Sequence, residues 1–170
     1  MDFILDTHTF IWFINGEALP KAVKDKIKNI NNRCFLSIAS IWEIAIKSSL
    51  GKLTMAAGFD EIASILSNNN IEVLPITLEH IQQLIKLPYN HNDPFDRLII
   101  SQSIAESAVV LTVDTKFKLY PINVQWGNSL PLWVYSSSSS SLYFFFFFFS
   151  SDAGAPATQI TNSPLAGWVS

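Results

Sequence analysis

Residues 94–114 read PFDRLIISQSIAESAVVLTVD, and this stretch decides the fold. Its first part, residues 94–107, has the apolar spacing of a helix and begins at a proline, which suits the first helical turn. Its second part, residues 109–113, is a continuous apolar run, as expected of a strand buried on both faces. Asp114 ends that run. The stretch therefore predicts a helix followed by a buried strand with a carboxylate at its end.

The same alternation of strand and helix extends outward over residues 1–126. Further short apolar runs occupy residues 3–5, 34–36 and 72–76. Helical patterns lie at residues 7–15, 20–31, 38–50, 59–66 and 78–87, with a short helix expected near residues 116–119. Strands that alternate with helices form βαβ units, which build a mostly parallel sheet with helices on both faces. The sequence therefore predicts the α/β class.

The composition limits the kind of protein further. The chain has 170 residues, enough for one domain with a sizeable core, and 11 basic against 14 acidic side chains. A net charge of −3 excludes a broadly basic protein that coats nucleic acid. The single cysteine, Cys34, allows no internal disulfide and no cysteine-based zinc site. Because the N-terminal segment lacks the basic region of a signal peptide, we expect a cytoplasmic domain.

The C-terminal part of the chain has a different composition. All basic residues and 13 of the 14 acidic residues lie in residues 1–126, whereas residues 127–170 hold one charge, Asp152, and runs of six serines and six phenylalanines. That part has neither helical nor strand periodicity. A membrane span over residues 130–149 has the right length, but serines interrupt it and no lysine or arginine flanks it. We predict a domain at 1–126 and a disordered or spurious low-complexity tail at 127–170, without membrane association.

Four carboxylates are candidates for chemistry because of where the predicted elements place them. Asp6 and Asp114 follow strands, at the edge where a parallel sheet gathers its functional groups. Glu43 lies in an apolar helix, where a charge needs a partner, and Asp93 precedes the helix whose first turn holds Asp96. Converging acids repel one another unless a divalent cation neutralises them, and oxygen ligands favour Mg²⁺ or Mn²⁺. Zinc is not expected without a cysteine and histidine cluster.

Each of these acids also has a purely structural interpretation, because helix caps and helical ion pairs are common. The structural interpretations are N-caps for Asp6, Asp93 and Asp114, the N3 position of a helix for Asp96, and for Glu43 either a capping box with Ser40 or an ion pair with Lys47. Taken singly, each of them explains its residue adequately. Taken together, the acids favour a shared site.

Four segments, in order and in spacing, resemble the signature segments of PIN-domain ribonucleases, and most closely those of VapC-type toxins of bacterial toxin–antitoxin pairs. They are LDTH at residues 5–8, SIWEIAIK at 40–47, DPFDR at 93–97 and LTVD at 111–114. The resemblance covers about residues 2–126, and the tail has no counterpart in the family. It implies a Rossmann-like PIN fold, with a central, mostly parallel sheet flanked by helices.

The resemblance also implies an Mg²⁺-dependent (or Mn²⁺-dependent) endoribonuclease that cleaves RNA with metal-activated water. By position, the catalytic and metal-binding residues are Asp6, Glu43, Asp96 and Asp114, and the supporting or substrate-binding candidates are Thr7, Lys47, Asp93 and Arg97. The implied partners are an RNA substrate, a cognate antitoxin that covers a hydrophobic groove, and a second copy in a homodimer. His8 fits a polar residue in the first helical turn better than a general base, and His80 and His91 have no informative spacing.

Other functions remain open at this stage. A catalytically silent PIN-like module that binds protein or RNA is the main alternative, although such a module has no need to keep like charges together. A phosphotransferase-type hydrolase would need a second aspartate two residues after Asp6, where this chain has His8. A third possibility is that the tail drives aggregation and the full chain does not function.

Overall fold

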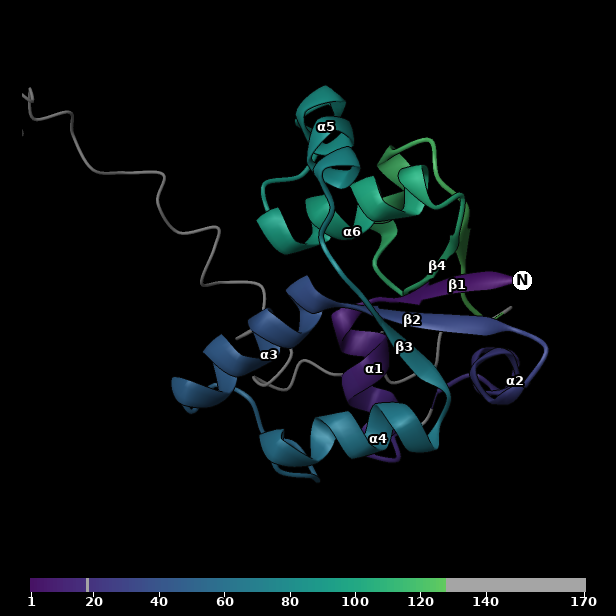
Figure 1. Ribbon diagram of the computed structural model, residues 1–170, viewed down its shortest axis with the longest axis vertical. Coiled ribbons are helices and arrows are strands. Elements are labelled where there is room, and N and C mark those ends of the chain that lie inside the picture. Colours follow the sequence, from purple (N-terminus) through teal and green to yellow (C-terminus); the bar gives the residue numbers. More distant parts are fainter. Residues whose placement is uncertain (18, 128–170) are drawn as a thin grey trace, which may run out of the picture. The chain divides into compact units, whose positions relative to one another are not determined.

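The computed structural model describes residues 1–17 and 19–127 (Figure 1). The predicted tail, beyond its first residue, and the candidate membrane span at 130–149 lie outside the described residues. Among the helices that the structure does describe, none is both long enough and apolar enough to cross a membrane.

A five-stranded parallel sheet forms the centre of the fold, with the strand order β3-β2-β1-β4-β5. The strands are β1 (Asp2–Leu5), β2 (Arg33–Ser37), β3 (Ile71–Leu74), β4 (Val109–Leu111) and β5 (Val124–Gln125). The chain builds the sheet outward from β1 in one direction through β2 and β3, and then returns to the other side of β1 with β4 and β5. Such a reversal opens a crevice at the carboxyl ends of the two strands where the direction changes. Here those strands are β1 and β4.

Helices cover both faces of the sheet, as the α/β prediction required (Figure 1). The helices are α1 (Thr7–Ile14), α2 (Lys21–Lys28), α3 (Ile38–Ser49), α4 (Ile62–Asn68), α5 (Leu78–Lys86) and α6 (Pro94–Ala105), with 3-10 turns η1 (Phe59–Glu61) and η2 (Thr115–Leu119). The core on one face contains side chains of α1, α2, α3 and α4, and the core on the other face contains side chains of α5, α6 and η2.

The strands supply side chains to both cores, which explains their continuous apolar sequences. In β1, Phe3 and Leu5 belong to one hydrophobic cluster and Ile4 belongs to the other. The prediction of burial on both faces is wrong for β3, where Glu72 and Val73 are exposed. The physical reason is its position, because β3 is an edge strand with only β2 beside it.

The ends of the elements differ from the sequence prediction in a few places. Helix α3 ends as predicted before Gly51, whose φ of +64° is a left-handed conformation that glycine adopts at little cost. Strand β5 was not predicted, because two residues are too short to give a periodic signal. The predicted helix at 59–66 consists of the turn η1 followed by α4.

Candidate metal centre

Asp6 lies at the carboxyl end of β1 and is almost fully buried, with 1% of its surface exposed. Its Oδ2 accepts a hydrogen bond of 2.8 Å from the hydroxyl of Thr112, at the end of β4. Its Oδ1 is buried and has no hydrogen-bond partner among residues 1–17 and 19–127. Asp6 occupies the N-cap position of α1, as predicted, but its side chain makes no capping hydrogen bond. A buried carboxylate oxygen without a partner is costly unless a ligand satisfies it.

Glu43 is also buried, on the face of α3 that contributes to the site. One carboxylate oxygen accepts a hydrogen bond of 2.7 Å from the hydroxyl of Thr7, the residue after Asp6. The other oxygen pairs with the ammonium group of Lys47, which confirms the helical ion pair. The capping-box interpretation is wrong, because α3 begins one turn earlier and its N-cap is Ser37.

A second group of ligand atoms surrounds the start of α6. Atoms of His91, Asp96 and Asp114 lie within 4.8 Å of one another, so these three side chains could hold a metal ion together. Asp96 occupies the first turn of α6, because Asp93 caps that helix by accepting hydrogen bonds from the backbone N–H groups of Phe95 and Asp96. The N-cap interpretation of Asp93 is therefore confirmed.

Thr112 connects the two parts of the site. Its hydroxyl donates to Asp6 and accepts a hydrogen bond of 3.0 Å from the backbone N–H of Asp114. The Asp114 carboxylate in turn accepts from the backbone N–H of Lys116, so the predicted cap of the short helix is confirmed. Consequently the acids after β1 and β4 are held in a fixed relation by one threonine.

The local electrostatics agree with several acids sharing one desolvated space. The pKa of Asp96 is raised to about 7: burial is the main cause, the hydrogen bonding and charge of His91 oppose it, and the charges of Asp6 and Asp93 add to the rise. His8 lies beside the same acids, with its Nδ1 3.8 Å from Asp6 Oδ2. Its burial lowers its pKa, but the nearby acids Asp6 and Glu43 outweigh burial and raise the pKa overall.

Arg97 has a different environment from the one that its place after Asp96 suggested. Its guanidinium donates hydrogen bonds to the backbone carbonyls of Pro88 (2.8 Å) and Leu87 (3.4 Å) and lies 4.3 Å from the ring centre of Tyr89. The side chain is only 7% exposed. Arg97 therefore fixes the segment that leads into α6.

Two residues of the site were missed by sequence reasoning. Thr112 and His91 each lie two residues before an aspartate of a signature segment, Asp114 and Asp93, and accept a hydrogen bond from its backbone N–H. That spacing is the only sequence signal for either residue, and it is a weak one. Their contacts with Asp6 and Asp96 depend on the folded chain.

The donor set fits a hard divalent cation. It consists mainly of carboxylate oxygens, with the imidazole of His91 beside them, and one of these oxygens has no partner among the described residues. The one cysteine of the chain, Cys34, is buried on another strand. Such ligands suit Mg²⁺ or Mn²⁺ rather than zinc. A bound cation would also satisfy Asp6 Oδ1 and relieve the repulsion that Asp96 experiences.

Comparison with known proteins identifies the fold family. The family model of the PIN domain matches residues 3–123. This chain belongs to the PIN-domain family. The match covers strands β1 to β4 apart from Asp2, includes all four acidic positions, and ends just before β5.

Solved structures of similar fold agree with this assignment of the PIN domain. VapBC2 from Rickettsia felis, bound to a DNA fragment from its promoter, has a TM-score of 0.58 at 21% identity and covers 74% of this chain and 99% of its own. DNA-bound VapBC from Salmonella typhimurium has a TM-score of 0.56 at 20% identity, with 74% and 97% covered. VapBC-1 from nontypeable Haemophilus influenzae gives 0.53 at 20% identity, with the same coverage. None of the curated proteins compared matches the chain.

Proposed function

We propose that this PIN domain is a metal-dependent endoribonuclease and the toxin of a toxin–antitoxin pair, active in the cytoplasm. The observation that carries the proposal is the buried, unpartnered oxygen of Asp6 beside the Asp96 and Asp114 pair, at the crevice between β1 and β4. Buried like charges are costly to keep, and a binding-only module gains nothing from them. A site that binds a divalent cation explains why Asp6, Asp96 and Asp114 are kept together.

In this proposal, Asp6, Glu43, Asp96 and Asp114 hold Mg²⁺ or Mn²⁺ against an RNA phosphodiester. When bound, the ion supplies a water of lowered pKa and neutralises charge on the phosphate. The chain itself orients the ligands: Thr112 fixes Asp6, and Thr7 and Lys47 fix Glu43. Because Glu43 already carries the Lys47 ammonium, a cation that uses Glu43 must share it with or displace that group.

The direct experiment is cleavage of cellular RNA by the purified full chain with Mg²⁺, with Mn²⁺ and with EDTA. Wild-type protein should cleave only with metal, and Asp6→Asn should abolish cleavage while the domain stays folded. Asp25→Asn is the matched control, since Asp25 lies in α2, paired with Lys21, with 60% of its side chain exposed. Full activity of folded Asp6→Asn protein would exclude this metal site. RNA binding without cleavage in every metal would favour the silent module instead.

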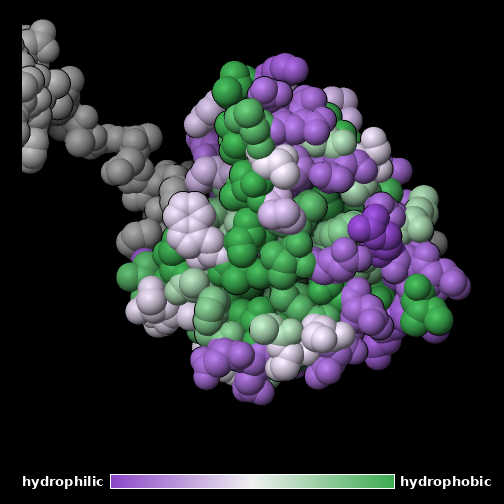
Figure 2. Space-filling view, viewed as in Figure 1, coloured by the Kyte–Doolittle hydropathy of each residue, from purple (hydrophilic) through white to green (hydrophobic). Residues whose placement is uncertain are grey.

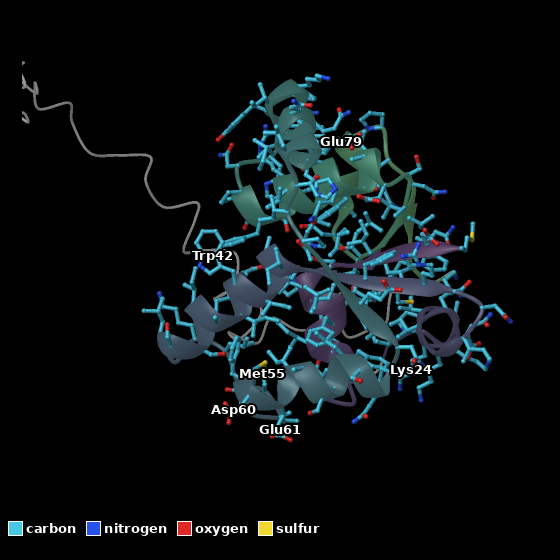
Figure 3. The ribbon with its side chains drawn as sticks, viewed as in Figure 1. Lys24, Trp42, Met55, Asp60, Glu61 and Glu79 are labelled. Carbon is cyan, nitrogen blue, oxygen red and sulfur yellow. The ribbon has the colours of Figure 1, made fainter. Side chains whose placement is uncertain are left out.

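The proposed antitoxin partner has a candidate groove. A pocket of about 390 Å³ lies beside α1, α2 and α4, and its lining residues are Phe13, Ile14, Gly16, Lys24, Lys28, Ile65 and Asn69. Figure 3 shows Lys24 on the α2 side of the molecule. Apolar side chains and lysines line this pocket, so it suits a peptide in which an apolar residue and an acidic residue lie close together. Ile65→Glu should weaken binding of a cognate antitoxin, whereas Asp25→Asn should not.

The proposed homodimer has a candidate face on α3. Exposed apolar side chains recur there every four residues, at Ile38 (38% exposed), Trp42 (60%), Ile46 (37%) and Leu50 (60%). Figure 3 shows Trp42 projecting from α3 near the start of α6, where it packs edge-on against Phe95.

Figure 2 shows apolar surface on the face where β3 and α5 lie. The exposed apolar side chains of these two elements and of the segment between them include Val73, Ile76, Leu78 and Ile85. Apolar areas of this kind mark protein interfaces. Leu50→Lys should convert a dimer to a monomer in light scattering, and Ile30→Lys, at an exposed position after α2, should not.

A further inference from the structure

His91 is part of the acid site although it lies outside the four signature segments. Its side chain is buried, with 8% of the residue exposed, and its Nε2 lies 2.8 Å from Asp96 Oδ2. Together with Asp96 and Asp114 it forms the group of ligand atoms within 4.8 Å. Two roles are compatible with this position: His91 either binds the cation directly or holds a carboxylate that does.

The hydrogen bond at the other ring nitrogen decides between these roles. His91 Nδ1 accepts the backbone N–H of Asp93 at 3.1 Å. A ring nitrogen that accepts a hydrogen bond carries no proton, so a neutral imidazole carries its proton on Nε2. Nε2 therefore presents an N–H to Asp96 and not the lone pair that a metal ion needs. Ligation through Nε2 would move the proton to Nδ1, where it would face the Asp93 N–H and break that bond.

Hydrogen bonds fix the segment around His91 on both sides. Arg97 binds the carbonyls of Leu87 and Pro88, before His91, and Asp93, after it, caps α6. The Nε2–H is not aligned closely enough with Asp96 Oδ2 to count as a hydrogen bond, and no other described group accepts it. At 2.8 Å the two atoms are within hydrogen-bond distance, so only the angle separates this contact from a hydrogen bond.

We propose that His91 is a positioning residue of the metal centre, whose Nε2–H orients the Asp96 carboxylate beside Asp114 without ligating the cation. The effect of His91 on metal affinity rests on the proposed function. The tautomer of His91 and its contact with Asp96 do not depend on that function. Partners that orient a metal ligand typically change affinity by about 10- to 100-fold.

Nitrogen-15 NMR of the full chain, labelled at histidine, tests the tautomer directly. The His91→Asn variant assigns the His91 signals among the three histidines of the sequence. We expect a proton on Nε2 and none on Nδ1, both without metal and at saturating Mg²⁺. A proton on Nδ1, or loss of the Nε2 proton when Mg²⁺ binds, would overturn the proposal.

Two variants separate positioning from general structural support. The amide nitrogen of Gln reaches about as far as Nε2, whereas Asn reaches only the position of Nδ1. His91→Asn should therefore weaken Mn²⁺ binding about tenfold, and His91→Gln should recover most of the loss. His80→Gln is the control, because His80 is buried against Glu106 at the other end of α6.

Equal losses in His91→Asn and His91→Gln, or a directly bonded histidine nitrogen in the electron spin echo spectrum of Mn²⁺, would contradict the positioning role. If wild-type protein binds no Mn²⁺ at all, the proposed nuclease function fails. The NMR measurement on metal-free protein then still decides whether His91 donates to Asp96, so the two failures are distinguishable.

Discussion

At the residue scale, the buried Oδ1 of Asp6 lowers the stability of the metal-free protein, but the proposed function requires it. The partner of Asp6, Thr112, satisfies Oδ2, while no group within the described part of the chain donates a hydrogen bond to the buried Oδ1. A group of this kind is kept at the expense of stability, as functional sites commonly are. The amide of asparagine retains an acceptor for Thr112 and removes the buried charge.

Asp6→Asn should therefore be at least as stable as wild type when metal is absent. We expect the free energy of unfolding, measured with urea in EDTA, to rise by roughly 1 kcal/mol. In excess Mn²⁺ the order should reverse, because only wild type gains stability from ligand binding. A variant that is clearly less stable than wild type in EDTA would show that Asp6 is mainly a structural residue.

Cys34 provides a residue-level test of the core. The thiol lies in β2 with 1% exposure, and burial raises its pKa to about 11. The group therefore stays protonated at pH 8, and only the thiolate reacts with disulfide reagents. Native protein should not react with such a reagent over several minutes at pH 8, while protein unfolded in guanidinium should release one equivalent. Rapid labelling of the native protein would contradict the packing of β2.

At the scale of elements, the start of α6 determines where Asp96 and His91 lie. Asp93 caps the helix and Pro94 occupies its first position, so the helix begins at a fixed residue. Asp93→Ala should lower the free energy of unfolding by about 1 kcal/mol, and Asp93→Ser, which keeps a capping oxygen, should lose less. Urea denaturation measures both. Equal losses would mean that the Asp93 carboxylate acts through charge and not as a cap.

The sequence predicted these elements well and the contacts between them poorly. The Asp93-Pro94 pair is a local signal, and it correctly located the start of α6. The contact of Thr112 with Asp6 joins residues that are 106 positions apart, and nothing in either neighbourhood indicates it. The interpretation of Glu43 as part of a capping box with Ser40 was wrong for a related reason. The helix begins at Ile38, where the strand β2 ends and its packing sets the boundary.

At the scale of the whole molecule, we propose that residues 1–126 are a domain that folds without the tail. Strand β5 pairs with β4 through Val124 and Gln125, and Trp126 packs edge-on against Trp12 of α1. A chain of residues 1–126 should therefore show the same melting temperature as the full chain and a higher solubility. A chain of residues 1–123 lacks these contacts and should melt several degrees lower.

Comparing the three chains by thermal unfolding and by centrifugation tests this boundary. If residues 1–126 fail to fold, the tail contributes to the domain and the proposed division is wrong. If they fold but are no more soluble than the full chain, the phenylalanine run is not the aggregation hazard that its composition predicts.

Titration of the full chain with Mn²⁺ in a calorimeter tests most directly whether Asp6, Asp96 and Asp114 form a divalent metal site. The account predicts saturable binding by wild type and by the control Asp25→Asn, and loss of binding in Asp6→Asn and in Asp96→Asn, with all four proteins folded. Folded wild-type protein that binds no Mn²⁺, or binding that survives unchanged in both site variants, would contradict it.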